Sequence, residues 1–214
     1  LLPIWYPGAH VTLHLANGLE RQYSLCGDPA DRHHYDLAVL RTDDSSGGSK
    51  WMHENVLPGT TIEVSGPLNN FELEPARNYL FIAGGIGITP IKAMIESLPP
   101  QREWRLIYVG RSRSTMAFAR ELENRFPERV RSHAADENDG VDVIHAQSGI
   151  LHRRLHRVNR ALDQVAGEVF ELGARERHVQ MLGAAGIGGD ERRVDVGRHR
   201  GGQLDLGLLR RFLQ

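Results

Sequence analysis

A glycine-rich turn between a continuous apolar run and a helical pattern constrains this chain most. Residues 79–83 (Tyr-Leu-Phe-Ile-Ala) have the length and composition of a strand buried on both faces of a parallel sheet. The sequence Gly84-Gly85-Ile86-Gly87-Ile88-Thr89-Pro90 follows and leads into apolar residues at helical spacing. Glycines permit a tight turn that phosphates can approach, and the amides at a helix N-terminus attract anions. The pattern predicts a nucleotide-binding turn; the alternative is a plain strand-to-helix turn that uses glycine only for its geometry.

The residues that follow the glycines differ from the usual dinucleotide fingerprint. We expect Thr89 to cap the helix and Pro90 to occupy its first turn. A usual fingerprint has a third glycine and an acidic residue about twenty positions further on. Here Pro90 replaces that glycine, and Gly110-Arg111-Ser112-Arg113 stands where the acid would be. Arg111 and Arg113 fit either the 2′-phosphate of NADPH or the role of solvated loop charges.

Strand and helix patterns alternate after the turn. Residues 104–109 form a second buried strand, and a helix capped by Ser114 would bury Phe118, Leu122 and Phe126. A further strand follows at residues 130–133. This order, together with the glycine-rich turn, predicts a doubly wound, parallel α/β domain at residues 76–150 that binds a nucleotide.

The first 75 residues show the shorter rhythm of antiparallel strands. Asn17-Gly18 is a favoured pair for a hairpin turn. Short strands are expected at residues 10–15, 21–25, 35–40 and 61–64. Strands at this spacing predict a small antiparallel β-barrel domain at residues 1–75.

Residues 151–214 carry 12 Arg against 8 Asp plus Glu. They are expected to be a divergent, Arg-rich tail or the altered end of the nucleotide domain. The glycine-rich stretch at residues 183–189 has no convincing strand before it. The tail would be either a solvated extension or a basic surface that docks an acidic partner.

Composition excludes several classes of protein. The chain has a formal net charge of -1, so no global field would gather nucleic acid or an anionic membrane. The single cysteine, Cys26, excludes a disulfide scaffold and an iron–sulfur cluster held by four cysteines of this chain. We expect Cys26 to be a packing residue. His152 and His156 lack an apparent third ligand, so no metal site is expected. No transmembrane run or signal peptide is present, and we expect a cytoplasmic protein.

Two further motifs suit the binding of a phosphorylated heterocycle. Arg21-Gln22-Tyr23-Ser24-Leu25 offers a guanidinium, a phenol and a hydroxyl on one strand. Gly47-Gly48-Ser49 precedes a short helical pattern and is a second candidate phosphate site. An exposed strand and a flexible turn are the alternatives when each motif is taken alone.

Together these motifs resemble the ferredoxin–NADP reductase superfamily. The resemblance is closest to the reductase components of Rieske-type oxygenases, of the phthalate dioxygenase reductase and vanillate demethylase reductase type. It covers about the first 135 residues. The sequence segments that carry the resemblance include Arg21-Gln22-Tyr23-Ser24-Leu25-Cys26, Gly47-Gly48-Ser49, Gly84 to Pro90, and Arg111-Ser112-Arg113.

The resemblance implies a role for each motif. Arg21 would pair the flavin phosphate with the help of Gly48 and Ser49, and Tyr23 would contact the flavin. Ser24 would act catalytically, by a hydrogen bond near the ring nitrogen that receives hydride. Ala38, Val39 and Leu40 would line the isoalloxazine, while the nicotinamide side would be formed by Gly85, Gly87, Ile88, Thr89 and Pro90, with Arg111 as a further nucleotide-binding residue. The implied cofactors are FMN, with FAD as the alternative, and NADH or NADPH as electron donor.

The implied function is an NAD(P)H-dependent flavin oxidoreductase that passes electrons to a separate iron–sulfur protein or oxygenase component. Three features of the family are missing: the first barrel strand, the 2Fe-2S domain, and a Cys-Gly-Pro motif near the nicotinamide. The alternative function is therefore a truncated or defective flavin-binding fragment without productive nicotinamide binding.

Overall fold

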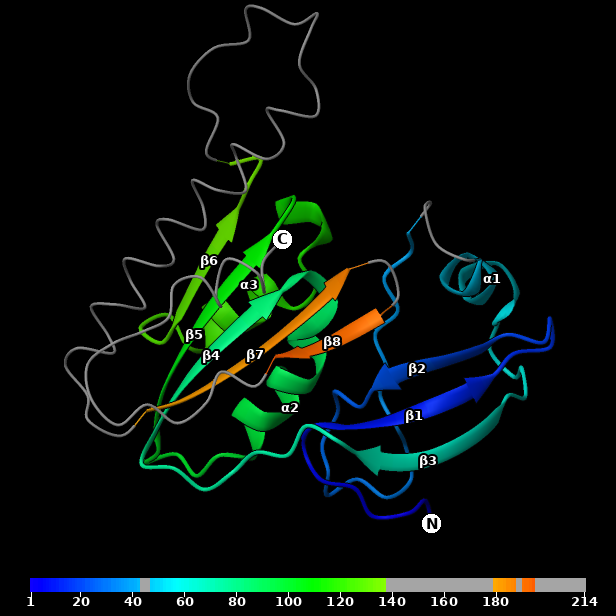
Figure 1. The fold of residues 1–214 in the computed structure, drawn as a ribbon, viewed down its shortest axis with the longest axis horizontal. Coiled ribbons are helices and arrows are strands. Elements are labelled where there is room, and N and C mark those ends of the chain that lie inside the picture. Colours follow the sequence, from blue (N-terminus) through cyan, green and yellow to red (C-terminus); the bar gives the residue numbers. More distant parts are fainter. Residues whose placement is uncertain (43–46, 138–178, 188–189, 195–214) are drawn as a thin grey trace, which may run out of the picture.

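The computed structural model describes residues 1–42, 47–137, 179–187 and 190–194, which form two domains (Figure 1). The first domain holds a three-stranded antiparallel sheet of order β2-β1-β3, with one helix beside it. Its elements are β1 (Ala9–His14), β2 (Glu20–Ser24), α1 (Gly48–Asn55) and β3 (Glu63–Asn69).

The strands of the first sheet follow the alternation in the sequence. In β1, Val11 and Leu13 are buried while the residues between them are partly exposed. The predicted antiparallel pairing of β1 with β2 is confirmed, with His10 opposite Ser24 and His14 opposite Glu20. The apolar face of the sheet therefore packs into the core of this domain.

Two strand predictions in the first domain were wrong in detail. Residues 35–40 form no strand; Leu37 makes only an isolated bridge to Leu25. The Val39 carbonyl is instead 2.8 Å from Nε2 of His53, so a side chain of α1 takes the place of a strand neighbour. The strand expected at residues 61–64 begins at Glu63 and continues to Asn69, because it pairs with the whole length of β1.

The second domain is built on a five-stranded sheet of order β6-β5-β4-β7-β8. Strands β4, β5, β6 and β7 are parallel, and β8 pairs antiparallel to β7. The central strand β4 is buried over all of its residues except the two ends. The predicted fold class, an antiparallel flavin-barrel type of domain followed by a parallel-sheet nucleotide domain, is confirmed. The strands are β4 (Asn78–Gly84), β5 (Glu103–Gly110), β6 (Val130–Ala134), β7 (Val179–Ile187) and β8 (Asp190–Val194).

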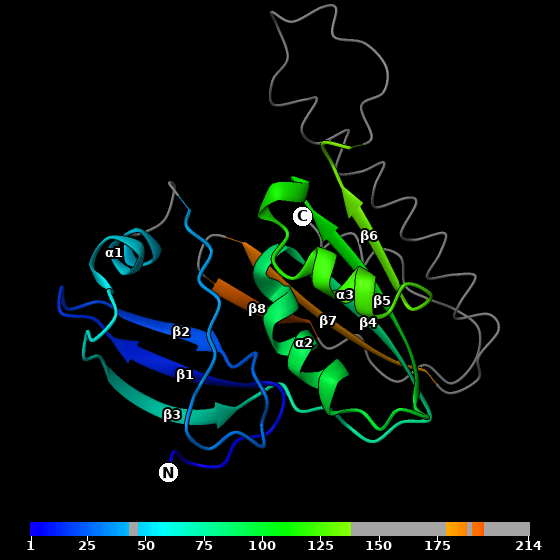
Figure 2. The same ribbon diagram turned by 180° about the vertical axis from the view of Figure 1, so that it is seen from behind.

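Helices α2 (Ile88–Ser97) and α3 (Ala119–Arg125) lie on the same face of this sheet (Figure 2). The inner side of α2 buries Ile91, Met94 and Ile95. Each such side chain contributes roughly 1.5–3 kcal/mol by leaving water. Aromatic residues of β4 and β5 complete this core, with Phe81 edge-on to Trp104.

Both predicted helix caps were wrong. A 3-10 turn, η1 (Gly85–Gly87), precedes α2, so the helix already begins at Ile88 and Thr89 lies inside it. The Thr89 hydroxyl donates a hydrogen bond to the carbonyl of Ile86 instead. Before α3, the Ser112 side chain accepts from the amide of Ser114 at the start of the 3-10 turn η2 (Arg113–Thr115). Ser112 thus caps η2, whereas α3 begins after Phe118 and has no side-chain cap.

The glycine-rich stretch near residue 183 was also misjudged. The sequence showed no strand before it, whereas the structure includes residues 183–187 in β7 itself, paired with β4. A strand placed between β4 and β8 needs small or apolar residues more than it needs alternation. The remaining tail predictions, including the His152–His156 pair, lie outside the described residues.

Candidate cofactor site

The first half of the candidate site lies where α1 begins against β2. Gly48 is buried at the first position of α1, and Arg21 of β2 covers it. A Cβ on Gly48 would come within 2.9 Å of Cγ and Cζ of Arg21, and closer still to its Nε. Gly47 precedes the helix with φ 88°, in the left-handed region that favours glycine. The structure therefore brings together the guanidinium and the helix N-terminus that the sequence predicted as phosphate ligands.

The segment before α1 is held to the helix by side chains. The hydroxyl of Ser49 accepts a hydrogen bond from the backbone amide of Thr42 at 3.3 Å. His53, one helical turn later, bonds the carbonyl of Val39. Ala38, Val39 and Leu40 are partly buried along this segment. The residues expected to line a flavin ring therefore lie in the segment that α1 holds.

Tyr23 and Ser24 occupy the end of β2. Tyr23 is partly exposed, and desolvation raises the pKa of its phenol, opposed by the nearby positive charge of Arg21. Ser24 is buried, with 4% of its surface exposed. Both side chains are uncharged at neutral pH, so they suit contact with a heterocycle and leave the phosphate to Arg21.

The second half of the candidate site is the glycine turn at the carboxyl end of β4. Gly85 has φ 53°, which glycine adopts without strain. The turn continues directly into α2; Gly87 at its end is buried, as are Ile88, Thr89 and Pro90 in the first turn of the helix. Ligands of parallel sheets bind at the carboxyl ends of the strands and at the helix N-termini that follow. The turn is in that position.

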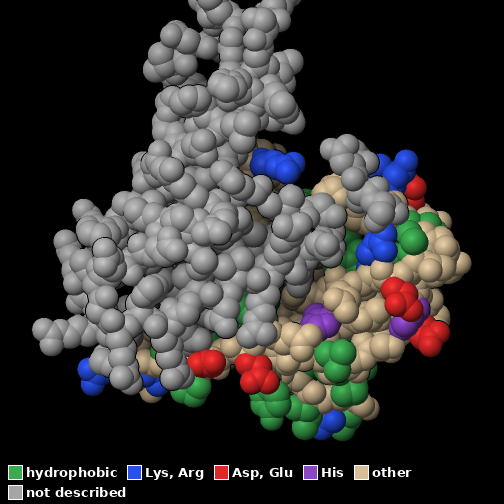
Figure 3. Space-filling view, viewed as in Figure 1, with side chains coloured by type: hydrophobic (Ala, Val, Ile, Leu, Met, Phe, Trp, Pro, Cys, Tyr) green, Lys and Arg blue, Asp and Glu red, His purple; other side chains and the backbone are tan. Residues whose placement is uncertain are grey.

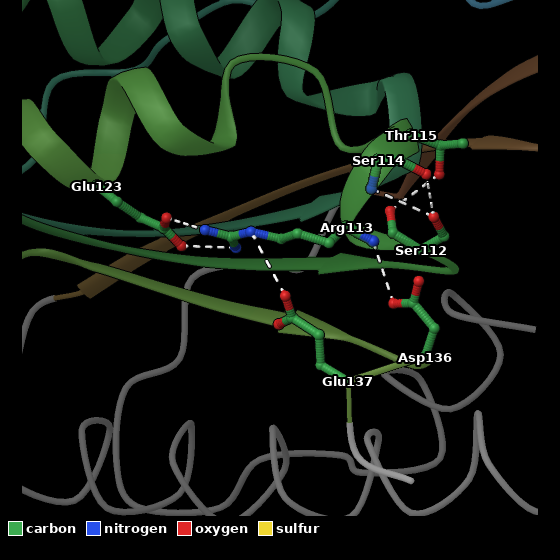
Figure 4. A network of polar contacts seen from close by, with 7 residues as sticks. All are labelled: Ser112, Arg113, Ser114, Thr115, Glu123, Asp136 and Glu137. Carbon is green, nitrogen blue, oxygen red and sulfur yellow. Dashed lines mark hydrogen bonds and ion pairs between the residues drawn. The ribbon is translucent and has the colours of Figure 1, made fainter.

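Arg111 and Arg113 follow the carboxyl end of the next strand, β5, and have different environments. Arg111 is exposed. The guanidinium of Arg113 forms a bidentate ion pair with Glu123, in which Nη1 and Oε1 are 2.8 Å apart (Figure 4). Its Nε also lies 3.8 Å from Oε1 of Glu137. Its backbone amide donates to Asp136. Arg113 is thus bonded to carboxylates. The sequence had predicted either a phosphate ligand or a solvated charge, and neither interpretation includes these ion pairs.

The network around Arg113 also shifts proton affinities. Hydrogen bonding to Arg113 lowers the pKa of the Glu123 carboxyl, while burial opposes this change. The same bond raises the pKa of Arg113. Both shifts favour the charged pair, so Arg113 is held in place at neutral pH.

Helix α2 joins the two halves of the site. Ala93 packs in the apolar cluster of the first domain, together with Leu25 and Met52. The ammonium of the preceding Lys92 lies 3.4 Å from the carbonyl oxygen of Cys26 and 2.8 Å from Glu96. The helix that begins at the glycine turn is therefore fixed against the domain that carries Arg21.

Beside this joint lies an open hollow of ≈ 490 Å³. Residues from both domains line it, namely Cys26, Tyr35, Asp36, Leu37, Lys92, Phe118 and Glu121. Burial raises the pKa of the Cys26 thiol to about 11, which fits the packing role expected for this residue. The hollow shares no lining residue with either half of the candidate site.

Sequence reasoning missed three residues that support the site. Tyr108 donates its hydroxyl to the carbonyl of Gly85, Lys92 bridges the domains, and His53 holds the segment before α1. Tyr108 was assigned only to a buried strand, because nothing in its sequence neighbourhood shows that its hydroxyl lies under a turn more than twenty residues earlier. Spatial proximity alone reveals these roles.

The residues present fit a phosphorylated flavin on one domain and a dinucleotide on the other. Gly48 has no Cβ and so admits the Arg21 side chain against the first residue of α1, which places a positive charge at the helix N-terminus. Among the described residues, no group of three or more His, Cys, Asp or Glu could hold a metal ion. No helix among them is long and apolar enough to span a membrane. On the face of the first domain in Figure 3, basic, acidic and apolar side chains are interspersed.

Fold and site geometry resemble those of two-domain flavin and nicotinamide-nucleotide reductases, and known proteins of this class are similar to the chain. The chain is 48% identical over 117 residues to phenoxybenzoate dioxygenase subunit beta of Ectopseudomonas oleovorans, covering 54% of this chain and 37% of that protein. It is 46% identical to vanillate O-demethylase oxidoreductase of Pseudomonas putida, covering 52% of this chain and 36% of the relative. The matched part therefore spans little more than a third of these relatives.

A solved structure extends the likeness to most of the chain. Phthalate dioxygenase reductase, described as a modular structure for electron transfer from pyridine nucleotides to 2Fe-2S, superposes with a TM-score of 0.62 and 30% identity. The superposition covers 85% of this chain and 51% of that one. The chain belongs to the ferredoxin–NADP reductase superfamily, in the group of Rieske oxygenase reductases.

A family model described as NAD-specific glutamate dehydrogenase matches residues 106–214. By this match, the second half of the chain belongs also to the sequence family of that description. The matched range includes most of β5 and all of α3, β6, β7 and β8; its strands belong to the five-stranded sheet of the second domain, and α3 lies on one face of that sheet. The glycine turn and the whole first domain lie outside the matched range, whereas Arg111 lies inside it.

Proposed function

We propose that this chain is the flavin- and nucleotide-binding part of an NAD(P)H-dependent flavin oxidoreductase. The observation that carries the proposal is the double role of α2. This helix starts at the glycine turn and packs Ala93 into the domain that holds Arg21 and Gly48. A nucleotide bound at the turn and a flavin bound at α1 would thus be held by one rigid arrangement.

In this proposal each predicted residue has a binding or orienting role. Arg21, Gly48 and Ser49 bind the flavin phosphate, Tyr23 contacts the ring, and the segment of residues 38–40 lines it. Ser24 donates a hydrogen bond near the ring atom that accepts hydride. Gly85, Gly87, Ile88, Thr89 and Pro90 bind the nicotinamide nucleotide, with Arg111 beside it. A bound flavin would supply the ability to accept a hydride and release single electrons.

We propose FMN as the flavin, with FAD as the alternative, as the family resemblance implies. The engagement of Arg113 by Glu123 and Glu137 supports NADH over NADPH, because the guanidinium is already neutralised where a 2′-phosphate would lie. The acceptor we propose is a separate iron–sulfur protein or oxygenase component. Relatives of this chain include a reductase subunit of phthalate 4,5-dioxygenase and a subunit of phenoxybenzoate dioxygenase.

An anaerobic visible spectrum tests the proposal. The purified chain is loaded with FMN or FAD, separated from free flavin, and scanned before and after addition of NADH, then NADPH. We expect retention of FMN and bleaching of its band by NADH. Retained flavin that neither nucleotide bleaches would identify a defective flavin-binding fragment, and a folded chain that retains no flavin would overturn the assignment of the first domain.

The proposed direction of electron flow needs a second measurement. With NADH in excess, the flavin-loaded chain is mixed with a plant-type 2Fe-2S ferredoxin, and reduction of the ferredoxin is followed in the visible range. Reduction that depends on the chain supports the proposed class of acceptor. Flavin bleaching without reduction of any iron–sulfur protein tested would point to a different acceptor.

A further inference from the structure

The hydroxyl of Tyr108 lies under the glycine turn. Tyr108 comes from β5, is fully buried, and donates a hydrogen bond of 3.0 Å to the carbonyl oxygen of Gly85. Gly85 is the residue of the turn with positive φ. The same carbonyl also accepts the amide of Ile88 at the start of α2. Two donors from the protein interior therefore fix the direction of one peptide group in the turn.

This direction determines what the turn presents on its outer side. A trans peptide is planar, and its carbonyl and its amide point in opposite directions. With the Gly85 carbonyl directed towards Tyr108 in the core, the amide of Ile86 points away from β5. Amides that point outward at the beginning of a helix are the groups that bind phosphate.

We propose that Tyr108 is a positioning residue for the nicotinamide nucleotide, acting through the peptide between Gly85 and Ile86. The inference rests on the proposed function, because it assigns the turn to the nucleotide. Tyr108 itself contacts no ligand. Its hydroxyl keeps the turn in the conformation that binds the pyrophosphate. The nucleotide therefore binds a turn that is already ordered, and less conformational entropy is lost on binding.

Burial keeps this hydroxyl in its donor form. Desolvation raises the pKa of Tyr108 far above its ordinary value, and Arg113 opposes the shift only in part. The phenol is therefore protonated at every pH at which the protein would work. The turn should keep its conformation across the physiological range.

Tyr108→Phe tests the inference, because it removes one oxygen and leaves the Gly85 carbonyl bonded to Ile88. Tyr79→Phe is the matched control: Tyr79 is nearly as buried, its hydroxyl makes two hydrogen bonds, and it lies at the opposite end of β4. Tyr79 precedes Gly85 by six positions, which corresponds to about 20 Å of extended chain. Both variants lose a buried hydroxyl, and only one loses it under the turn.

We expect Tyr108→Phe to weaken NAD⁺ binding, measured by calorimetry on the flavin-loaded protein, by roughly five- to tenfold. KM for NADH should rise by a similar factor while kcat and flavin retention change little. Hydrogen exchange of the peptide that spans residues 84–90 should be faster than in wild type without any nucleotide present. Tyr79→Phe should leave all these quantities as in wild type.

Three outcomes would overturn the inference: unchanged NAD⁺ affinity in Tyr108→Phe, an equal loss in Tyr79→Phe, or a fall in kcat alone. Failure of the proposed function looks different, because wild type itself would then bind no NAD⁺ and would not be bleached by NADH. Hydrogen exchange in the turn remains informative in that case, since it needs no activity.

Discussion

The side chain of Arg21 lies directly against Gly48, so strand β2 and the first residue of α1 form one cradle. Gly48 has no Cβ, and the space that a Cβ would take is filled by the guanidinium. The arrangement explains why a glycine stands at the beginning of α1 although glycine weakens helices. It also makes the cradle sensitive to a single methyl group.

Gly48→Ala is expected to weaken flavin binding by roughly tenfold, because the methyl group displaces the guanidinium that would pair the phosphate. The fold should survive, since the flexible Arg21 side chain can move away. Equilibrium dialysis with FMN measures the affinity, and circular dichroism checks the fold. Lys50→Ala, an exposed change in the same helix, is the control; equal affinities in the two variants would contradict the role of the cradle.

The ion pairs of Arg113 predict how nucleotide preference can be changed. Replacing both Glu123 and Glu137 by Gln should free the guanidinium for a 2′-phosphate. We expect the ratio of kcat/KM for NADPH to that for NADH to rise by roughly tenfold. Adding Arg113→Ala to this double variant should cancel the gain; a gain that persists would show that another group receives the phosphate.

The pKa of Glu123 predicts a pH-dependent contribution to stability. Its pKa in the folded protein lies below the ordinary value of 4.5, so the unfolded chain takes up the proton first as pH falls. The stabilisation is therefore complete above about pH 4.5 and disappears as pH falls through the lower folded value. Urea unfolding of wild type and Glu123→Gln between pH 3 and pH 7 should show a difference that shrinks at the acidic end.

Glu103→Gln serves as the control for that series. Glu103 is 67% exposed and lies 3.9 Å from Arg129, so its ion pair should contribute little at any pH. A constant difference between wild type and Glu123→Gln across the whole range would mean that packing, and not the charge of Glu123, stabilises this part of the fold.

Lys92 predicts a link between stability and the arrangement of the two domains. Its side chain is 11% exposed, and its ammonium contacts the Cys26 carbonyl, Glu96 and Glu121. Lys92→Met should lower the free energy of unfolding by about 2 kcal/mol, since a charged hydrogen-bonded group is lost and Glu121 is left without it. Lys50→Met, at the other lysine of the chain, which is exposed, should change the free energy of unfolding by less than about 0.5 kcal/mol.

Local patterns in the sequence determined most of the architecture. Continuous apolar runs fixed β4 and β5, alternation fixed β1, and the glycines before Ile88 placed the turn, because these signals depend on neighbours within a few residues. The candidate site residues likewise came from short motifs. The motifs gave Arg21 and Gly48 as two separate candidate phosphate sites, the family resemblance implied a single phosphate for both, and the structure adds their direct contact.

Tertiary structure decided the features that depend on residues far apart in the chain. Residues 35–40 form no strand, and His53 bonds the Val39 carbonyl instead. Thr89 does not cap α2, because η1 ends at Gly87 and the helix begins at Ile88. Arg113 acquired acidic partners from α3 and from the residues after β6. Side-chain hydrogen bonds form only after the sheet has assembled, so their partners cannot be predicted from local sequence. Local sequence patterns thus determined the type of each domain. Only the assembled sheet determined which side chains hold the glycine turn and the segment before α1 in place.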